Sequence, residues 1–275
     1  MHWQTARFRI DLAQPRVMGI VNVTPDSFSD GGRYHSTSAA LAHCERLVAE
    51  GADILDLGAE SSRPGSPPVP VDEELGRLLP VLRSVVALGV PVSVDTSKPE
   101  VMRECLAAGA DIVNDIWALR QPGAREAIAA HPLCGVCLMH MHGEPRTMQQ
   151  SPMEGDAVAQ VRAFLEQQAQ ALRALGVAAE RIVVDPGIGF GKTVAQNFAL
   201  LARQRELLAS GHALLAGWSR KSSLGHVTGM DVGDRMVPSV AAALIAVERG
   251  ARIVRVHDVR ETVAALKVWR AAQEH

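Results

Sequence analysis

Short apolar runs alternate with longer amphipathic segments along the whole chain. Eight runs have the length and the Ile, Val and Leu content of strands buried in a parallel sheet. The segments between them carry a helical period, most clearly over residues 73–88, 154–175, 195–209 and 258–272. The predicted strands cover residues 17–23, 54–58, 92–95, 112–115, 135–140, 182–185, 213–217 and 253–257.

A short phrase repeats where a predicted helix gives way to a strand. It reads Gly-Ala-Asp-Ile over residues 51–54 and 109–112, and Gly-Ala-Arg-Ile over 250–253. Glycine suits the left-handed position that ends a helix, and the apolar residues after it suit a buried strand. The repeating unit is therefore helix followed by strand.

Eight such units predict the α/β class, a single-domain (β/α)8 TIM barrel over residues 1–275, with residues 1–16 as an N-terminal extension packing on it. The alternative is a doubly wound open sheet. Such a sheet usually has fewer strands and places its phosphate loop after the first of them.

Composition narrows the function classes. The chain is 47% hydrophobic and 21% charged, which excludes disordered and fibrous proteins. A net charge of −2 gives no overall field for nucleic acid or anionic membrane, and no apolar run reaches the roughly 20 residues of a membrane span. The four cysteines follow no disulfide framework, and the N-terminus lacks the apolar core of a signal peptide. We therefore expect a cytoplasmic protein.

Polar residues end most of the predicted strands. In a (β/α)8 barrel the active site is built at the carboxyl ends of the strands, so these side chains are the candidates to examine. Any one of them could simply be a turn residue, but the convergence of many favours a site. They are Asn22, Asp56, Asp95, Asn114, Asp115, His140, Asp185, Arg255 and His257.

Residues 186–193 resemble a phosphate-binding P-loop and follow a predicted strand. The first glycine of that motif is replaced by Pro186, which has a fixed φ and no amide hydrogen. We therefore favour a glycine-rich barrel loop in which small residues let the backbone approach a ligand.

Cys134, Cys137, His140 and His142 have the residue types of a zinc site. On a strand, however, Cys137 would point to the face opposite the other three. Buried thiols and a histidine at the edge of the site are the simpler interpretation.

The segment 219–223 places Arg220 and Lys221 between serines, next to Arg255 and His257 if the barrel closes. It reads as a local anion site, although a solvated basic loop is the alternative. Asp258, with Glu261, predicts a helix N-cap with a capping box. Together with Asp95, Asn114 and Asp185, the cations favour a ligand with a nitrogen heterocycle at one end and a phosphate group at the other.

Six ordered motifs now carry a family resemblance over almost the whole chain, from about residue 17 to the last helix. The chain resembles the dihydropteroate synthases, whose (β/α)8 barrel agrees with the strand count. The motifs are MGIVNVTPDSFSDGG (18–32), DLGAESSRPG (56–65), SVDTSK (93–98), DPGIGFGK (185–192), SRKS (219–222) and RVH (255–257).

The resemblance implies a transferase that condenses 6-hydroxymethyl-7,8-dihydropterin diphosphate with p-aminobenzoate, releasing diphosphate with the help of Mg²⁺. It implies no nucleic-acid or membrane partner, and a homodimer. The implied catalytic residues are Asp95, Lys221 and Arg63. The implied pterin-binding residues are Asp95, Asn114, Met139, Asp185, Phe190, Lys221 and Arg255. The diphosphate would bind Asn22, Arg63, Arg255 and His257, with Asn22 also on the metal. The p-aminobenzoate would bind Phe28, Ser61, Ser62, Arg63, Pro64, Phe190, Lys221 and Ser222, with the first two long loops closing over it.

An aromatic amine is a weak nucleophile, so departure of diphosphate should run ahead of attack, with Asp95 stabilising the positive charge that develops. The chain departs from the family pattern at Ala59, where glycine is usual, and at Ser62, where we expect threonine. Two alternatives are a pterin-dependent methyltransferase, which would not need the cations of 219–222, and a non-catalytic paralogue that only binds pterin.

Overall fold

Eight parallel strands form a closed barrel in the computed structural model, which describes residues 1–23, 32–61, 68–144, 147–148 and 150–274, with the side chains of 32–36 left aside. The barrel order is β10-β3-β4-β5-β6-β7-β8-β9, so β10 closes it against β3. Each predicted strand is confirmed to within one residue at either end. The strands are β3 (Arg16–Asn22), β4 (Ile54–Gly58), β5 (Val92–Asp95), β6 (Ile112–Asp115), β7 (Gly135–Met139), β8 (Ile182–Asp185), β9 (Ala213–Ala216) and β10 (Ile253–Val256).

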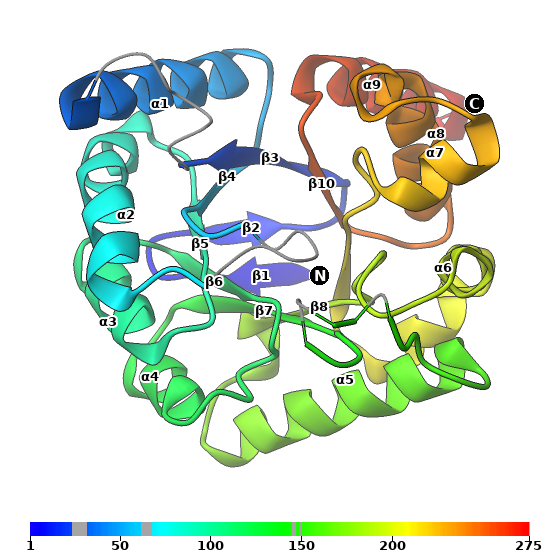
Figure 1. Cartoon of the computed structure of the whole chain (residues 1–275), viewed down its shortest axis with the longest axis horizontal. Helices are drawn as coiled ribbons and strands as arrows, with labels where there is room; N and C mark the ends of the chain where they lie inside the picture. The colour runs from blue at the N-terminus through cyan, green and yellow to red at the C-terminus, as the bar shows by residue number, and fades with distance from the viewer. Residues whose placement is uncertain (24–31, 62–67, 145–146, 149, 275) are drawn as a thin grey trace.

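Helices form a ring around the barrel (Figure 1). Those in the described residues are α1 (Gly32–Ala49), α2 (Val71–Val85), α3 (Pro99–Ala107), α4 (Ala124–Ala130), α5 (Ala157–Ala174), α6 (Val194–Ala202), α7 (Ser222–Thr228), α8 (Met236–Glu248) and α9 (Val259–Gln273). As the repeated phrase predicts, Gly51, Gly109 and Gly250 take positive φ angles of 102°, 103° and 98°. Within the described ranges, no helix has the length and apolar character of a membrane span.

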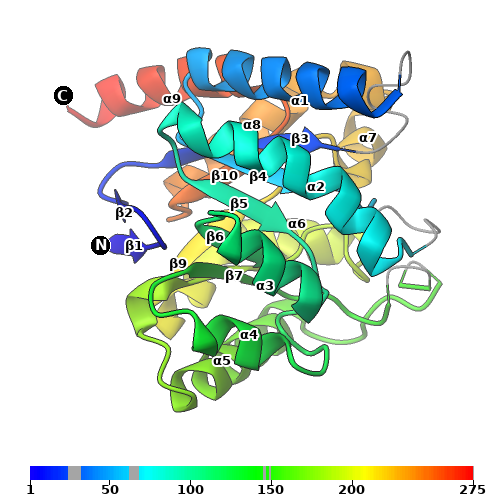
Figure 2. The same cartoon turned by 90° about the vertical axis from the view of Figure 1, so that its left-hand side faces the viewer.

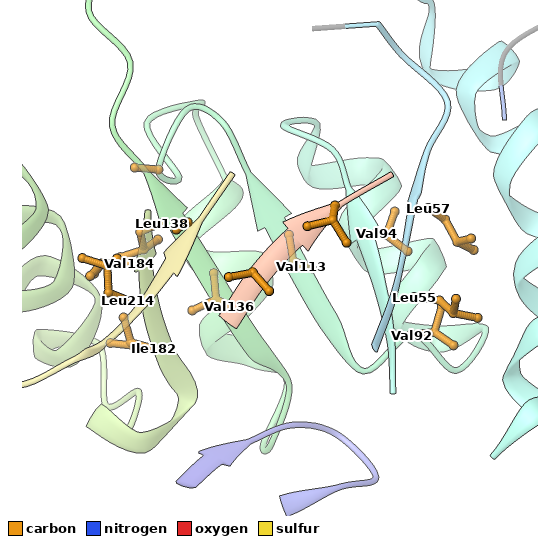
Figure 3. Packing of buried hydrophobic residues seen from close by; sticks show 14 of the residues in the cluster. Leu55, Leu57, Val92, Val94, Val113, Val136, Leu138, Ile182, Val184 and Leu214 are labelled. Carbon is orange, nitrogen blue, oxygen red and sulfur yellow. The ribbon is translucent and has the colours of Figure 1, made fainter. Parts of the chain in front are cut away.

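The side chains of each strand alternate between the barrel interior and the surrounding helices. The outward series forms the main core and includes Leu55, Val94, Val113 and Leu138, which lie between the strands and the helices (Figure 3). The inward series forms a second cluster. Its strand members are Met18, Ile54, Ile112, Cys137, Val183, Ala213, Leu215 and Ile253.

The first residues form a β-hairpin, β1 (His2–Gln4) with β2 (Arg9–Asp11), which the sequence patterns do not predict. It lies at the end of the barrel opposite to that at which the strands point (Figure 2). Trp3 is fully buried within the inward cluster and donates from Nε1 to the carbonyl oxygen of Arg181 at 3.0 Å. The hairpin therefore covers the amino-terminal end of the interior, and the opposite end remains for the site.

Candidate active site

The inward series becomes polar where the strands reach the carboxyl end of the barrel. Two residues beyond the apolar inward layer, the chain places Asp56, Asn114, Asp185 and Arg255. Pairing between strands puts Gly58 beside Asp95, Asp95 beside Asn114, and Met139 beside Asp185. The period-2 alternation therefore gathers the predicted strand residues on one rim. Those on the inward series are Asn22, Asp56, Asp95, Asn114, Met139, Asp185, Arg255 and His257.

Arg255 is the cation at the centre of this rim. Its Nε donates to Asp56 Oδ2 at 2.6 Å, and its Nη2 donates to Asp95 Oδ2 at 2.8 Å. Asn114 Nδ2 also donates to Asp56 Oδ2, at 3.2 Å. One planar guanidinium thus joins β10 to β4 and β5 across the interior.

Asp95 has an unusual protonation equilibrium. Burial raises the pKa of its carboxyl to about 7, although Arg255 opposes the rise, and the neighbouring acids Asp56 and Asp115 add to it. Asp56 is fully buried, and its Oδ1 has no partner among the described residues. The rim therefore holds more acceptor capacity than its own donors satisfy, which suits a ligand that carries N–H groups.

Asp185 and Lys221 face this rim from the next strands. Asp185 Oδ1 accepts from the Gly187 amide at 2.7 Å. Its Oδ2 lies towards Gly217, and a Cβ added to Gly217 would still be 3.8 Å from this oxygen. Burial raises the pKa of Asp185. Burial and then Arg255 lower the pKa of Lys221 to about 8, and its ammonium lies 4.3 Å from the centroid of the Phe190 ring.

The segment 219–223 sends its two cations in different directions. Arg220, at φ 58°, pairs with Asp258 at 2.6 Å, so it turns away from the rim that Lys221 faces. Asp258 occupies the N-cap of α9, but its side chain makes no cap hydrogen bond. The predicted capping box is wrong, because Arg220 takes the carboxylate that would have capped the helix.

His257 is held by Ser219. The Ser219 hydroxyl accepts from the His257 amide at 3.1 Å and lies 2.9 Å from Nδ1 of the ring. Burial, with Arg220 and Arg255, lowers the pKa of His257 to about 3, so the ring is neutral. A hydroxyl that donates to Nδ1 favours the tautomer with its proton on Nε2, where it can donate to an anion.

Two cavities border residues of this rim, and the second extends along α1 as far as Glu50. One, of about 450 Å³, is bounded by Asp95, Ser61, Ile116 and Trp117. The other, of about 720 Å³, is bounded by Asn22 and His257 together with residues of α1. Asn22, at the end of β3, therefore borders the same cavity as His257, which directly follows β10.

The remaining predicted residues lie at the margin of this arrangement or beyond the described part. Phe190 and Met139 pack in one apolar cluster with Met141 and Met148. Ser222 is exposed in the first turn of α7. Phe28, Ser62, Arg63 and Pro64 lie outside the described residues.

Asp115 and His140, which the sequence offers as strand-end candidates, do not face the rim. Both fall on the outward series of their strands. The Asp115 carboxylate accepts from the amides of Trp117 and Leu119 at 2.8 and 2.7 Å, and His140 packs edge-on against Phe164 of α5. Each therefore holds the loop or helix beside it rather than facing the rim.

The other two motifs take the shapes that the sequence favours. Cys137 lies in the inward cluster and Cys134 in the outward core, so the two thiols point to opposite faces. The glycine-rich loop lies directly against the end of β7: a Cβ at Gly187 would stand 1.9 Å from the His140 carbonyl oxygen, and one at Gly191 would stand 2.2 Å from that of His142. Only glycine permits this approach.

Two residues of the site have no role that the sequence predicts. Asp56 is one of the polar strand ends, and its place one layer below Asp95 follows from the register that pairs it with Ser93. Ser219 is a hydroxyl beside two cations in the sequence. No sequence pattern separates a hydroxyl that holds a histidine from one that contacts solvent.

Comparison with known proteins places the chain in a family. A family model described as "Pterin binding enzyme" matches residues 18–257. A dihydropteroate synthase from Neisseria meningitidis serogroup B is 50% identical, over 98% of this chain and 96% of its own. The Xanthomonas albilineans dihydropteroate synthase with 4-aminobenzoic acid superposes with a TM-score of 0.93 at 50% identity, covering 99% of both chains. The Burkholderia cenocepacia dihydropteroate synthase complexed with 7,8-dihydropteroate gives 0.90 at 52% identity, covering 99% of this chain and 96% of its own.

The polar rim on a closed (β/α)8 barrel, together with the match over residues 18–257, defines a pterin binding enzyme. Within this class, the chain belongs to the dihydropteroate synthase family.

Replacing Arg255 by methionine should destabilise the fold in a pH-dependent way. The variant leaves the buried Asp56 and the largely buried Asp95 without their cation, which should cost about 3 to 5 kcal/mol at pH 8. The loss of stability should become smaller towards pH 5. A carboxyl whose pKa is raised in the folded state opposes folding only at pH values at which it is ionised. Urea unfolding of both proteins at pH 5 and pH 8 measures the difference.

Arg162→Met is the matched control, since Arg162 makes only an exposed ion pair with Glu166 on α5. It should change stability little at either pH. An Arg255→Met variant as stable as the parent at pH 8 would contradict the assigned role of the guanidinium.

Proposed function

We propose that this chain joins 6-hydroxymethyl-7,8-dihydropterin diphosphate to p-aminobenzoate, forming 7,8-dihydropteroate and diphosphate for folate synthesis. The observation that carries the proposal is the rim itself. Asp95, Asn114 and Asp185 offer acceptors on one side of the barrel mouth, while Lys221, Arg255 and His257 offer donors on the other. Such a rim matches a ligand with a hydrogen-bonding ring and an anionic tail.

The pterin would lie with its N–H edge towards the carboxylates. Asp185 Oδ1 is fixed by Gly187, and its Oδ2 has no hydrogen-bond partner within the described ranges, so it can accept from an amine and the adjacent ring N–H. A ring without those donors would leave a buried carboxylate unpaired, which gives strong discrimination. Lys221 would donate to the ring from the opposite side.

Apolar and planar groups would sandwich the ring. Met139 and Phe190 are buried in the same cluster, and Ile116 and Trp117 pack against it. Arg255 is held flat by its two carboxylates, which suits stacking on a heterocycle. The site would therefore order the substrate mainly with groups that are already fixed in place.

The reaction would proceed by departure of the leaving group before attack. The bond between the methylene carbon and the diphosphate oxygen breaks, and diphosphate leaves with the electron pair. The positive charge on the methylene carbon is shared with the ring, where the Asp95 carboxylate stabilises it. The amine nitrogen of p-aminobenzoate then forms the new C–N bond. The arylammonium that results is strongly acidic and gives its proton to water, so no strong base is needed.

Diphosphate would be held by Asn22, Arg255, His257 and Arg63, the last outside the described residues. His257, with its proton on Nε2, would donate to a phosphate oxygen. The site fits Mg²⁺, because this ion keeps most of its waters and needs few protein oxygens beside substrate phosphates. Asn22 presents an exposed amide at the end of β3 and would hold the ion, which neutralises phosphate charge when bound.

The p-aminobenzoate would lie between Phe190, Lys221 and Ser222 on one side and Ser61 on the other. The predicted partners Phe28, Ser62, Arg63 and Pro64 would complete this part of the site. The carboxylate of p-aminobenzoate is suited to the serine hydroxyls and to the amides at the start of α7, where Ser222 is the first residue.

We propose in addition that the chain forms a homodimer through the surface of α7, α8 and the turn between them, and that it acts in the cytoplasm. Of the ten exposed large hydrophobic side chains in the described ranges, six lie between residues 227 and 245. A second copy would remove this apolar surface from water. All four cysteines are free and buried, which supports a reducing compartment.

The direct test measures diphosphate release from the dihydropterin diphosphate with Mg²⁺, with and without p-aminobenzoate, and identifies the product by mass. Dihydropteroate should form with the native chain. Lys221→Ala should abolish turnover and weaken pterin binding by about 1.5 to 3 kcal/mol, since it removes a charge-assisted hydrogen bond. Tight pterin binding without product would instead favour a non-catalytic binding protein.

Activity should follow a bell-shaped pH profile. Asp95 must be ionised, so kcat/KM should fall as the pH drops through about 7, the raised pKa of its carboxyl. Lys221 must be protonated, so kcat/KM should fall as the pH rises through about 8. Asp95→Asn should lower kcat/KM and remove the acid limb, while Lys267→Ala, at an exposed lysine of α9, should keep both limbs. An acid limb that persists in Asp95→Asn would assign it to another carboxyl, such as Asp185.

The dimer is tested by placing a charge on the proposed surface. Val237 is 66% exposed on α8. Val237→Glu should shift the mass in solution from that of two chains towards that of one chain, 29.4 kDa. Light scattering after size exclusion measures the mass. Val268→Glu, at a residue 71% exposed on α9, is the control and should leave the mass unchanged. A Val237→Glu protein that keeps the native mass would rule out this surface.

A further inference from the structure

Lys192 is a buried cation that the proposed reaction does not use. The chain has four lysines: Lys98 pairs with two glutamates, Lys221 faces the rim, and Lys267 is exposed on α9. Lys192 is only 3% exposed, and no carboxylate of the described residues pairs with it. Its charge must therefore be compensated in another way, because an uncompensated buried ammonium is strongly unfavourable.

Three main-chain carbonyl oxygens surround the Lys192 ammonium. Nζ donates to Gly187 at 2.9 Å, to Phe190 at 3.0 Å and to His140 at 3.3 Å. An ammonium has three hydrogens, so its donor capacity is filled. We call these three oxygens the carbonyl cage. Three carbonyl dipoles that point at one place repel each other unless a cation lies between them.

Burial lowers the pKa of Lys192 to about 7; Asp185 counteracts this, and Lys221 adds to it. The cage is thus the main local compensation for the charge. The turn over residues 187–190 fixes two of the three oxygens relative to each other, because the Phe190 amide donates to the Gly187 carbonyl at 3.1 Å.

The cage joins the ends of two strands at the rim. The His140 carbonyl follows β7, while those of Gly187 and Phe190 lie in the loop that follows β8. That loop positions Asp185, because the Gly187 amide donates to Asp185 Oδ1 at 2.7 Å. It also places the Phe190 ring beneath the Lys221 ammonium. Two groups proposed to contact the pterin are therefore tied to the cage.

We propose that Lys192 is a positioning residue for the pterin: its ammonium closes the loop 186–193 onto the end of β7 and so presets Asp185 and Phe190. Lys192 acts through these two residues and does not contact substrate. The inference rests on the proposed function for its readout in catalysis, but the cage itself can be tested without any substrate.

Lys192→Ala removes the ammonium and three methylene groups, a fragment that propylammonium replaces. The KM for the dihydropterin diphosphate should rise at least tenfold, because both preset groups contact the pterin. The KM for p-aminobenzoate at saturating pterin should rise less, because only Phe190 is shared with that substrate. Added propylammonium should restore part of the lost kcat/KM and reach saturation. Tetramethylammonium, which has no N–H donor, should restore nothing at the same ionic strength. Lys267→Ala is the matched control and should respond to neither salt.

Thermal unfolding tests the cage without substrate. Propylammonium should raise the melting temperature of Lys192→Ala but leave that of the native chain and of Lys267→Ala unchanged. Lys192→Met, which keeps the volume and loses the charge, should unfold cooperatively and show the same rise in the KM for the pterin, larger than the rise for p-aminobenzoate. That variant keeps the test decisive if Lys192→Ala is poorly folded.

The proposal is overturned if Lys192→Met retains the native KM for the pterin, or if propylammonium fails to raise the melting temperature of Lys192→Ala. These results differ from a failure of the proposed function. In that case the native chain itself would neither bind the pterin nor release diphosphate, and the melting experiment would still report on the cage.

Discussion

The rest of the rim depends on the guanidinium of Arg255, which holds Asp56 and Asp95 inside the barrel. Carboxylates that converge in a dry interior repel one another and tend to become protonated. Arg255, on β10, donates one hydrogen bond to Asp56 on β4 and one to Asp95 on β5. This one cation lets both carboxylates remain at the barrel mouth. The same contacts immobilise the guanidinium plane, so one interaction both supports the fold and shapes the ligand site.

Closure of the barrel makes this interaction possible. β10 pairs with β3, and Arg255 lies beside Met18 in that register. Residues from the first and last strands of the barrel, Asn22 and His257, therefore border one cavity. An open sheet with the same strands would separate these edges and place the anion-binding groups far from Asn22. The division of the rim into acceptors and donors is thus a property of the topology as well as of the residues.

The sequence predicts the strands closely because buried apolar runs and terminal glycines are local signals. It does not predict which strand residues face inward. Strands covered on both faces are apolar on both, so the hydrophobic pattern does not separate Asn114 from Asp115, or Met139 from His140, and only the family resemblance chooses between them. The same limit explains Arg220 and Lys221, adjacent cations that part only because Arg220 adopts a positive φ and finds Asp258. The sequence does not predict the hairpin, because each of its strands has only three residues and two of the three in β2 are charged.

The distribution of lysine and glycine shows how the rim keeps its shape without substrate. Gly187 and Gly191 allow the loop after β8 to touch the backbone that follows β7, where any side chain would collide. That approach turns carbonyl oxygens towards each other, and Lys192 supplies the charge that they require. The glycines and the lysine are therefore interdependent: close backbone contact creates the cage, and the cage makes the contact stable. Asp185 and Phe190 take their positions from that balance, as Asp95 takes its position from Arg255.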